Sequence, residues 1–383
     1  PLFLKEHQLS EPVKNNTATR EETVVVSMPR VLAVDALRGF DMFWIIQGKE
    51  VVVSLLILVL GSIPPWLQYQ FSHPEWEGFS AWDIIMPLFL FITGVTIPFS
   101  MEKYITGKGS KRRFYIRLIR RFILLWILGM IAQGNLLTFD INKLHLFSNT
   151  LQAIAVGYLV SSLVLLYVPL RFHVLVTAIL LLTYWIWMMF IPLPGVGTGI
   201  LQPEQNWAMY IDELILGRFR DGTHYTWILS SLGFSATVML GTHAGYILRK
   251  IQSRWKIFWS YVGIGIACLF LAWIWSWHFP IIKHIWSSSM VLWSGGWCFL
   301  LLAVFYLIME IGGITKWAFP FIVIGSNAII AYIGAPFIKQ GILWLLGEKT
   351  SPFITTHIVP PTVLIITWLI LYLLYRKKWF LRV

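Results

Sequence analysis

Apolar runs long enough to span a membrane recur along almost the whole chain, and short polar segments separate them. A helix that crosses a bilayer needs about 20 largely apolar residues. Ten stretches meet this pattern: 31–48, 80–101, 122–138, 151–169, 173–191, 226–248, 257–277, 290–311, 319–338 and 360–375. We therefore expect an all-α, polytopic integral membrane protein with about ten transmembrane helices.

One shorter apolar run affects this topology. Residues 51–60 are too few to cross a bilayer, and Gly61, Pro64 and Pro65 end the run. We interpret it as a re-entrant or interfacial element. If it crosses instead, there are eleven helices and every later helix inverts.

The composition excludes an ordinary soluble protein. Hydrophobic residues make up 57% of the 383 residues and charged residues 13%, whereas a soluble domain has about 25% charged residues. Such a chain cannot bury its apolar surface in one aqueous core, so lipid must solvate much of it. We therefore expect the lipid bilayer to be a partner of the chain.

The placement of positive charge tests the topology. The net charge of +12 would also suit a nucleic acid partner. With the N-terminus in the cytoplasm, 22 of the 30 Lys and Arg residues fall in cytoplasmic segments and 7 in outside loops. Residues 102–121 alone carry eight of them. This distribution follows the positive-inside rule, so it predicts that both termini are cytoplasmic and argues against nucleic acid binding.

The chain divides near residue 30. Residues 1–30 are polar and lack a cleavable signal pattern, so we expect a flexible cytoplasmic arm there and one transmembrane domain over 31–383. Cys268 and Cys298 both lie in apolar runs, and no Cys/His cluster has the spacing of a metal site. We expect no bound metal.

The first predicted helix carries three charged residues on one face. Asp35, Arg38 and Asp41 are spaced by three, so they lie close enough to pair. Because a charge near the bilayer centre costs about 2.5–3.5 kcal/mol, each needs a reason. Two interpretations remain open: an ion-pair stripe that docks this helix in the bundle, or an arginine at the cytoplasmic mouth of a cavity, where it meets a phosphate.

A histidine and an aspartate stand together at the outside end of the second predicted helix. Asp83 lies in the first turn, where a carboxylate also stabilises the helix dipole. His73 precedes it by ten residues in an outside loop, beside Trp76 and Glu77. A histidine next to a carboxylate is the usual arrangement of a general base. The alternatives are a surface histidine and a simple helix cap.

Amide side chains gather at the outside ends of other helices. Gln133 and Asn135 end the third, and Asn149 and Gln152 begin the fourth. Asn327 lies in the middle of the ninth. Each amide alone is explained by a hydrogen bond to a neighbouring helix. Their concentration on one side predicts a polar pocket that opens to the outside and binds a polar ligand.

Nine collinear stretches give the chain a family resemblance. They are VDALRGFDMFW, HPEWEGFSAWDIIMPLFLFITG, RRFILLWILGMI, SNTLQAIAVGY, PLPGVGTG, YIDELILG, VMLGTHAGYIL, PFIVIGSNAIIAYIG and YRKKWF. From about Val31 to the C-terminus the chain resembles the transmembrane acetyltransferases of the heparan-α-glucosaminide N-acetyltransferase family and their bacterial relatives. The resemblance implies transfer of an acetyl group from cytosolic acetyl-CoA to a glucosamine amine across the membrane, by a homodimer.

The resemblance also implies roles for particular residues. The family's H-x-x-W-x-G-x-x-x-x-D context, which holds its active-site histidine, falls on His73, Trp76, Gly78 and Asp83. On this basis His73, Asp83 and Asn327 are expected to be catalytic, with Asp83 orienting the imidazole and Asn327 stabilising the oxyanion. The expected acetyl-CoA residues are Asp35, Arg38, Arg120 and Arg121, and the expected acceptor residues are Trp76, Glu77, Asn149 and Gln152.

The sequence departs from the family pattern in three places. Gln47 or Lys49 stands near the place where relatives have an Asn, a His after the Asn327 motif is replaced around Ala335, and the long soluble N-terminal region of the lysosomal enzymes is not seen. These differences leave the acceptor sugar open more than the reaction type.

Two other functions remain open from the sequence. A sugar or glycan transporter would also have broken helices and a polar cavity, and a related enzyme would acetylate a hydroxyl of a cell-envelope glycan. The only Asn-x-Ser/Thr sequon is at Asn15, on the inside arm, which favours a bacterial inner membrane over a lysosome.

Overall fold

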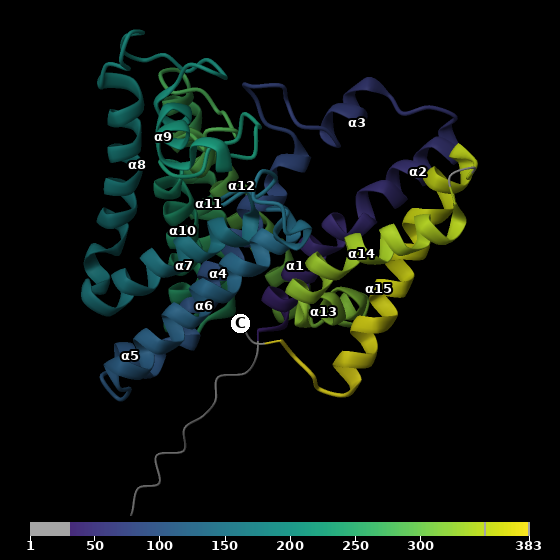
Figure 1. The fold of residues 1–383 in the computed structure, drawn as a ribbon. Coiled ribbons are helices and arrows are strands. Elements are labelled where there is room, and N and C mark those ends of the chain that lie inside the picture. The colour runs from purple at the N-terminus through teal and green to yellow at the C-terminus, as the bar shows by residue number, and fades with distance from the viewer. Residues whose placement is uncertain (1–30, 348–349, 382–383) are drawn as a thin grey trace, which may run out of the picture. The chain divides into compact units, whose positions relative to one another are not determined.

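The computed structural model describes residues 31–347 and 350–381, and within these ranges the chain forms helices and no strand (Figure 1). The predicted arm at 1–30 lies outside the described residues. The all-α prediction is confirmed for the described part of the chain. Eight of its helical segments are long and apolar enough to cross a membrane.

The first predicted helix is longer than expected. α1 (Leu32–Phe43) continues through a π-helical turn (Trp44–Gly48) into α2 (Lys49–Leu60), and the three form one 29-residue candidate span. The backbone kinks between α1 and α2, where Ile46 and Gln47 have non-helical φ and ψ angles. The interpretation of 51–60 as a re-entrant or interfacial element, and the number of crossings that it contributes, stay predictions.

The next helices form one group in the bundle. The longer ones are α4 (Ile85–Ser100), α6 (Lys111–Ala132), α7 (Thr150–Tyr167), α8 (His173–Phe190), α10 (Ser231–Lys250), α11 (Arg254–Ser276) and α12 (Ser288–Tyr306). The shorter ones are α3 (Pro65–Gln70), α5 (Glu102–Ile105) and α9 (Trp207–Leu216). The predicted spans 122–138 and 226–248 fall in α6 and α10, which are not among the eight apolar candidates because basic or polar residues interrupt them. The number of crossings beyond these eight stays a prediction.

The predicted ninth span, 319–338, is two helices instead of one. α13 (Phe319–Ser326) ends where Asn327 adopts φ −136° and ψ 44°, and α14 (Ala328–Leu346) starts again immediately. The tenth span is longer than predicted, because a π-helical turn (Ile354–Ile358) precedes α15 (Val359–Arg376). These helices pack beside α1 and α2 (Figure 1).

Close backbone contacts at glycines hold the bundle together. A Cβ atom on Gly39 of α1 would stand 1.7 Å from the carbonyl oxygen of Phe321 in α13. A Cβ atom on Gly241 of α10 would stand 1.9 Å from the carbonyl oxygen of Phe91 in α4. Only glycine allows helices to approach this closely, as is common in membrane bundles.

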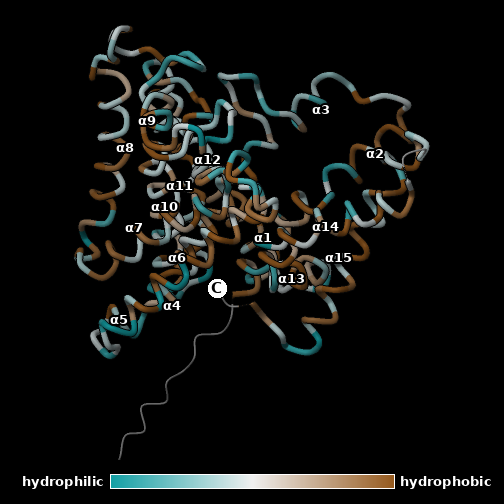
Figure 2. The backbone as a smooth tube through the Cα atoms, in the orientation of Figure 1, coloured by the Kyte–Doolittle hydropathy of each residue, from teal (hydrophilic) through white to brown (hydrophobic). Residues whose placement is uncertain are grey.

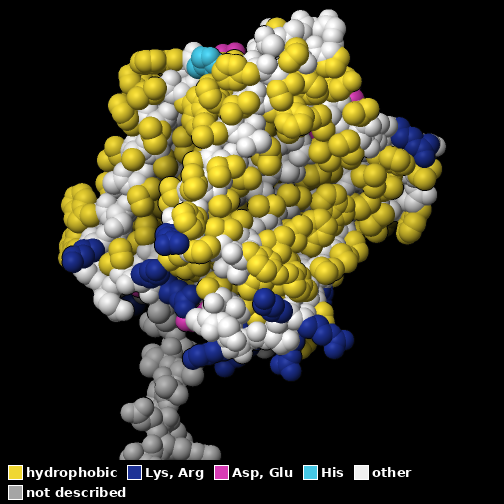
Figure 3. Space-filling view, turned by 90° about the vertical axis from the view of Figure 1, so that its left-hand side faces the viewer, with side chains coloured by type: hydrophobic (Ala, Val, Ile, Leu, Met, Phe, Trp, Pro, Cys, Tyr) yellow, Lys and Arg dark blue, Asp and Glu magenta, His cyan; other side chains and the backbone are white. Residues whose placement is uncertain are grey.

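The two ends of the bundle differ in charge. Apolar side chains cover most of the face shown in Figure 3, and its Lys and Arg side chains lie mainly towards the lower edge. We call this end, with α5 and the start of α1, the basic end. The opposite end, with the loops at 61–80, 192–230 and 277–287, is the loop end, and Figure 2 shows hydrophilic backbone in its loops. The orientation of these ends in a membrane stays a prediction.

Candidate active site

Two loops that are distant in sequence meet at the loop end. The amide of Gly78 donates a hydrogen bond to the carbonyl of Ile281 at 2.9 Å, and Glu77 forms an antiparallel bridge with Ile282. Gly78 has φ 123°, a conformation that favours glycine. This pairing brings the loop before α4 against the loop between α11 and α12.

His73 and Asp83 form a close pair at this junction. The Nδ1 atom of His73 lies 2.6 Å from Oδ1 of Asp83, which is fully buried. The other carboxylate oxygen of Asp83 accepts hydrogen bonds from the backbone amide of Ser80 at 2.9 Å and from its hydroxyl at 3.2 Å. Asp83 therefore caps the helix start and also contacts the histidine, so the two interpretations of this residue are compatible.

A buried lysine completes the cluster. The ammonium of Lys283 lies 3.1 Å from Oδ1 of Asp83 and 3.2 Å from Nδ1 of His73, and the residue is only 7% exposed. Burial lowers the pKa of Lys283 from its ordinary value, while the Asp83 carboxylate acts in the opposite direction. Lys283 lies 210 residues from His73, so no local sequence pattern links the two. The one available signal was its position as a rare cation in a predicted outside loop.

These contacts select the chemistry of the histidine. Because the Asp83 carboxylate can only accept a hydrogen bond, its contact favours the tautomer with the proton on Nδ1 of His73, which leaves Nε2 available to a substrate. The His73 side chain is 38% exposed. An imidazole held in this tautomer is suited to act as a general base or as a nucleophile.

A polar cavity of about 390 Å³ adjoins the cluster. His73 and Lys283 form part of its wall, and Asp221, Tyr225 and Gln133 add hydrogen-bonding groups from other loops and helices. The Asp221 carboxylate accepts hydrogen bonds from the backbone amide and hydroxyl of Thr223. The cavity thus presents an acid, a base and several hydrogen-bonding groups to a small polar ligand.

Comparison with known proteins shows what the chain is similar to. A family model described as a domain of unknown function, DUF5009, matches residues 30–157, which include His73 and Asp83. Heparan-alpha-glucosaminide N-acetyltransferase of Mus musculus is 24% identical over 424 residues, or 94% of this chain and 62% of that protein. The protein of the same name from Homo sapiens is 25% identical over 418 residues, or 93% of this chain and 60% of that protein. The chain spans about 60% of the length of these curated relatives.

The predicted acceptor residue Asn149 lies behind the cavity wall. Its Oδ1 accepts a hydrogen bond from Leu151 N at 2.7 Å and caps α7, and its Nδ2 donates to Gln133 Oε1 at 2.7 Å and Tyr332 OH at 3.0 Å. Gln133 and Tyr332 themselves line the cavity. Asn149 therefore positions two wall residues and does not itself line the cavity.

Gln152 has a similar position. Its Oε1 accepts from Ser148 N at 3.0 Å and its Nε2 donates to Leu146 O at 2.6 Å, and the side chain is fully buried. Its neighbours Ser148 and Thr150 reach the cavity instead. The sequence therefore indicated the correct helix end, but Asn149 and Gln152 hold the residues of the cavity wall in place and do not line the cavity themselves.

Trp76 and Glu77 shape the loop around the cluster. The indole nitrogen of Trp76 donates to Leu201 O at 2.8 Å, and its ring stacks on His284 with centroids 5.3 Å apart. Burial lowers the pKa of His284 to about 4, so a neutral imidazole packs there. The Glu77 side chain is exposed. Neither Trp76 nor Glu77 lines the polar cavity.

The predicted acetyl-CoA residues lie towards the basic end. Arg38 and Asp35 form an ion pair at 3.5 Å, and the guanidinium of Arg121 stacks over the Tyr158 ring at 3.9 Å from its centroid. Arg120 is exposed. Asp41 is fully buried, and its carboxylate has no hydrogen-bond partner among the described residues. Of the three charged residues expected to pair on this helix face, Asp35 and Arg38 form an ion pair, and Asp41 is not part of it.

Asn327 lies far from the cluster, at the basic end. Its Nδ2 donates to the Trp379 carbonyl at 3.0 Å, and its Oδ1 accepts from the Leu381 amide at 2.9 Å. The amide therefore fastens the C-terminal segment to the break between α13 and α14. Both polar groups of the amide are therefore engaged by the C-terminal segment, and the predicted oxyanion role of Asn327 at His73 stays a prediction.

No group of three or more His, Cys, Asp or Glu side chains that could hold a metal ion occurs within residues 31–347 and 350–381. The cluster at the loop end instead combines one acid, one imidazole and one ammonium. Its chemistry is that of proton transfer and charge stabilisation.

Proposed function

We propose that the chain transfers an acetyl group from cytosolic acetyl-CoA to the amine of a glucosamine-type sugar on the opposite side of the membrane. One observation carries this proposal. His73 and Lys283 of the cluster with Asp83 line a polar cavity at the loop end, whereas the arginines suited to phosphates lie towards the basic end. The similarity to N-acetyltransferases supports the reaction type.

On the acceptor side, Nε2 of His73 removes a proton from the sugar ammonium, and the free amine attacks the thioester carbonyl carbon. The C–S bond then breaks, CoA leaves as a thiolate, and the thiolate takes up the second amine proton as the amide forms. Asp83 stabilises the imidazolium, which later releases its proton to water. The Lys283 ammonium stabilises the oxyanion of the tetrahedral intermediate.

A covalent route uses the same residues. Nε2 of His73 attacks the thioester first, CoA leaves as a thiolate, and the acetyl-imidazole then passes its acetyl group to the amine. The Asp83 contact at Nδ1 supports both routes, because it leaves Nε2 unprotonated. Trapping of radiolabelled acetyl on protein without acceptor distinguishes them: label on His73 supports the covalent route.

On the donor side, the phosphates of acetyl-CoA bind near Arg38, Arg120 and Arg121, where charge-assisted hydrogen bonds hold them. Asp35 orients the Arg38 guanidinium through their ion pair. The pantetheine arm then reaches towards the loop end. A bacterial inner membrane and a homodimer complete the proposal as predictions from the sequence.

Proteoliposomes with acetyl-CoA inside and glucosamine outside test this function. His73→Ala is expected to lower transfer by about 10³-fold, the range of a lost general base. The control is His145→Ala, which removes a histidine of the loop between α6 and α7 that does not line the cavity. Full transfer by His73→Ala would show that this histidine is not the catalytic group.

The Asp221 carboxylate in the cavity favours an amine over a hydroxyl acceptor, because it attracts the sugar ammonium. Mass spectrometry of the product distinguishes the two, since an N-acetyl amide resists the mild base that cleaves an O-acetyl ester. Sugar accumulation without acetyl-CoA would instead support a transporter.

A further inference from the structure

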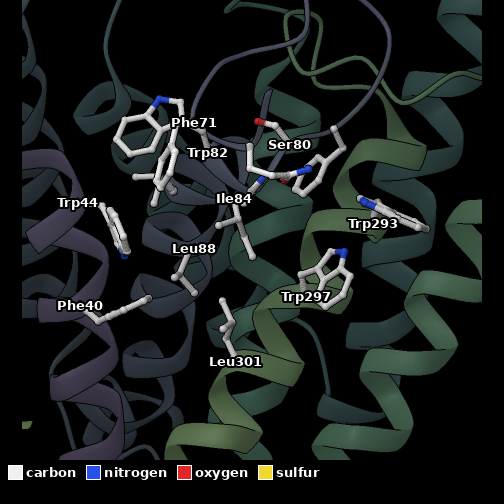
Figure 4. Close-up of a pocket in the computed structure, with 14 residues that line it drawn as sticks. Phe40, Trp44, Phe71, Ser80, Trp82, Ile84, Leu88, Trp293, Trp297 and Leu301 are labelled. Atoms are coloured by element: carbon white, nitrogen blue, oxygen red, sulfur yellow. The ribbon is translucent and has the colours of Figure 1, made fainter. Parts of the chain in front are cut away.

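A second cavity, of about 480 Å³, lies beside the polar cavity and has a different character. Its wall is largely aromatic (Figure 4). Phe40 of α1 and Trp44 of the π-helical turn after it lie on one side, and Trp293 and Trp297 extend from α12 on the other. We call this the apolar cavity.

The two cavities share a wall. Trp82 and Ile85 line both of them. The π-helical turn after α1 contributes to both as well, since Trp44 lines the apolar cavity and the next residue, Ile45, lines the polar cavity. The Trp82 side chain therefore separates a ligand in the apolar cavity from His73. The ring centroids of Trp82 and His73 are 6.5 Å apart.

The apolar cavity is bounded by segments suited to contact lipid. Its residues come mainly from the candidate spans Leu32–Leu60, Ala81–Ser100 and Ser288–Ile311. Trp297 at its edge is 40% exposed, so the cavity reaches the helix surface that a bilayer would cover. A water-soluble sugar gains nothing from this aromatic wall, whereas a hydrocarbon chain does.

Positive charge stands where the two cavities meet. The Lys49 ammonium lies over the Trp82 ring, 4.4 Å from its centroid. Lys283 lies close enough that repulsion from Lys49 contributes to lowering the Lys283 pKa. Among the contacts described above, Asp83 is the one carboxylate that balances the charge of these two ammonium groups. A phosphate between the cavities would complement this charge.

We propose that the acceptor is a lipid-linked amino sugar. Its hydrocarbon chain occupies the apolar cavity, its phosphate lies by Lys49, and its sugar enters the polar cavity with the amine towards Nε2 of His73. This inference rests on the proposed function for the reaction, but the lipid site itself is independent of it.

The first test compares polyprenyl phosphate-linked glucosamine with free glucosamine as acceptors in proteoliposomes that contain acetyl-CoA. kcat/KM for the lipid-linked acceptor is expected to be about 100-fold higher, because the bilayer holds this acceptor at a high local concentration beside the apolar cavity. Leu301→Trp fills the apolar cavity and lowers this ratio by about tenfold, through overpacking against the chain.

The matched control is Val304→Trp, on the same helix but 49% exposed and outside the apolar cavity. It is expected to keep the ratio of the unaltered chain. Equal kcat/KM for the two acceptors, or equal effects of the two Trp variants, would overturn the proposal.

Lys49→Gln is a second variant, and it leaves the packing intact. It should weaken the preference for a phosphate-linked glycolipid over an uncharged one. An unchanged preference would show that no phosphate binds at Lys49.

A binding experiment without acetyl-CoA separates the lipid site from the reaction. Radiolabelled polyprenyl phosphate-linked glucosamine should co-purify with the unaltered chain and with His73→Ala, and less of it with Leu301→Trp. If the lipid-linked sugar is retained but no acetyl transfer occurs, the proposed function is overturned and the lipid site stands. If acetyl transfer to free glucosamine occurs but the lipid-linked sugar is not retained, the lipid site is overturned and the proposed function stands. Displacement by an equal concentration of phosphatidylglycerol would identify an ordinary bilayer lipid as the occupant and overturn the proposal.

Discussion

The loop end and the basic end of the bundle hold their charges in opposite ways. At the loop end, His73, Asp83 and Lys283 compensate one another within 3.2 Å, and two of the three are almost fully buried. Towards the basic end, Arg38 pairs with its own helix neighbour and Arg121 rests on an aromatic ring. Charges fixed in a buried cluster are suited to act on a reacting group, whereas partly exposed arginines are suited to attract an anion.

The largest expected effect comes from removing the Asp83 carboxylate, which contacts both His73 and Lys283 at the loop end. Asp83→Asn is expected to lower acetyl transfer by about 10²-fold or more, because the amide cannot stabilise an imidazolium and leaves Lys283 buried without its counter-charge. Transfer assays in proteoliposomes measure this loss. Asp140→Asn, in the exposed loop after α6, is the control. Similar activities of the two variants would remove Asp83 from the mechanism.

The next change tests the buried ammonium. Lys283→Met keeps the length of the side chain but removes its charge, and is expected to lower kcat about tenfold through loss of oxyanion stabilisation. Steady-state assays in proteoliposomes measure kcat. An unchanged kcat would remove Lys283 from the mechanism.

A change towards the basic end should affect the donor alone. Arg121→Ala is expected to raise KM for acetyl-CoA by about tenfold, the contribution of one charged contact to a phosphate, and to leave KM for the acceptor unchanged. Arg171→Ala, in the short segment before α8, provides the control. An increase in the acceptor KM would show that the two ends do not divide the substrates.

The smallest expected effect on activity comes from Asn327. Asn327→Ala breaks two hydrogen bonds that hold the C-terminal segment and is expected to cost about 1–3 kcal/mol of stability. The melting temperature in detergent should fall while kcat of the folded protein stays the same. A large loss of kcat without a change in melting temperature would instead support a catalytic role for this amide.

Local features of the site could be read from the sequence, and long-range ones could not. His73 and Asp83 are ten residues apart, so one loop and one helix start bring them together. Lys283 reaches them only because Gly78 pairs with Ile281, and no short-range pattern encodes that contact. Asn149 and Gln152 were placed at the correct helix end, but which side of the wall they occupy depends on packing between helices.

The fold shows the same limit. Hydropathy identified nearly every long helix, because lipid-facing segments must be apolar whatever their neighbours are. It missed the break at Asn327, where apolar residues continue on both sides. It also separated 51–60 from the first helix, and the backbone does kink between the two at Gln47, which has φ 101°.

The contact between α4 and α10 restricts the path by which a thioester can reach His73. Where Gly94 and Gly241 meet the opposite backbone, even one added carbon atom would stand 2.0 Å or less from a carbonyl oxygen. A pantetheine chain cannot slide through such a seam. Any tunnel from the cytosolic side must therefore follow another flank of α4, and chemical crosslinks that lock these two helices together should leave turnover intact.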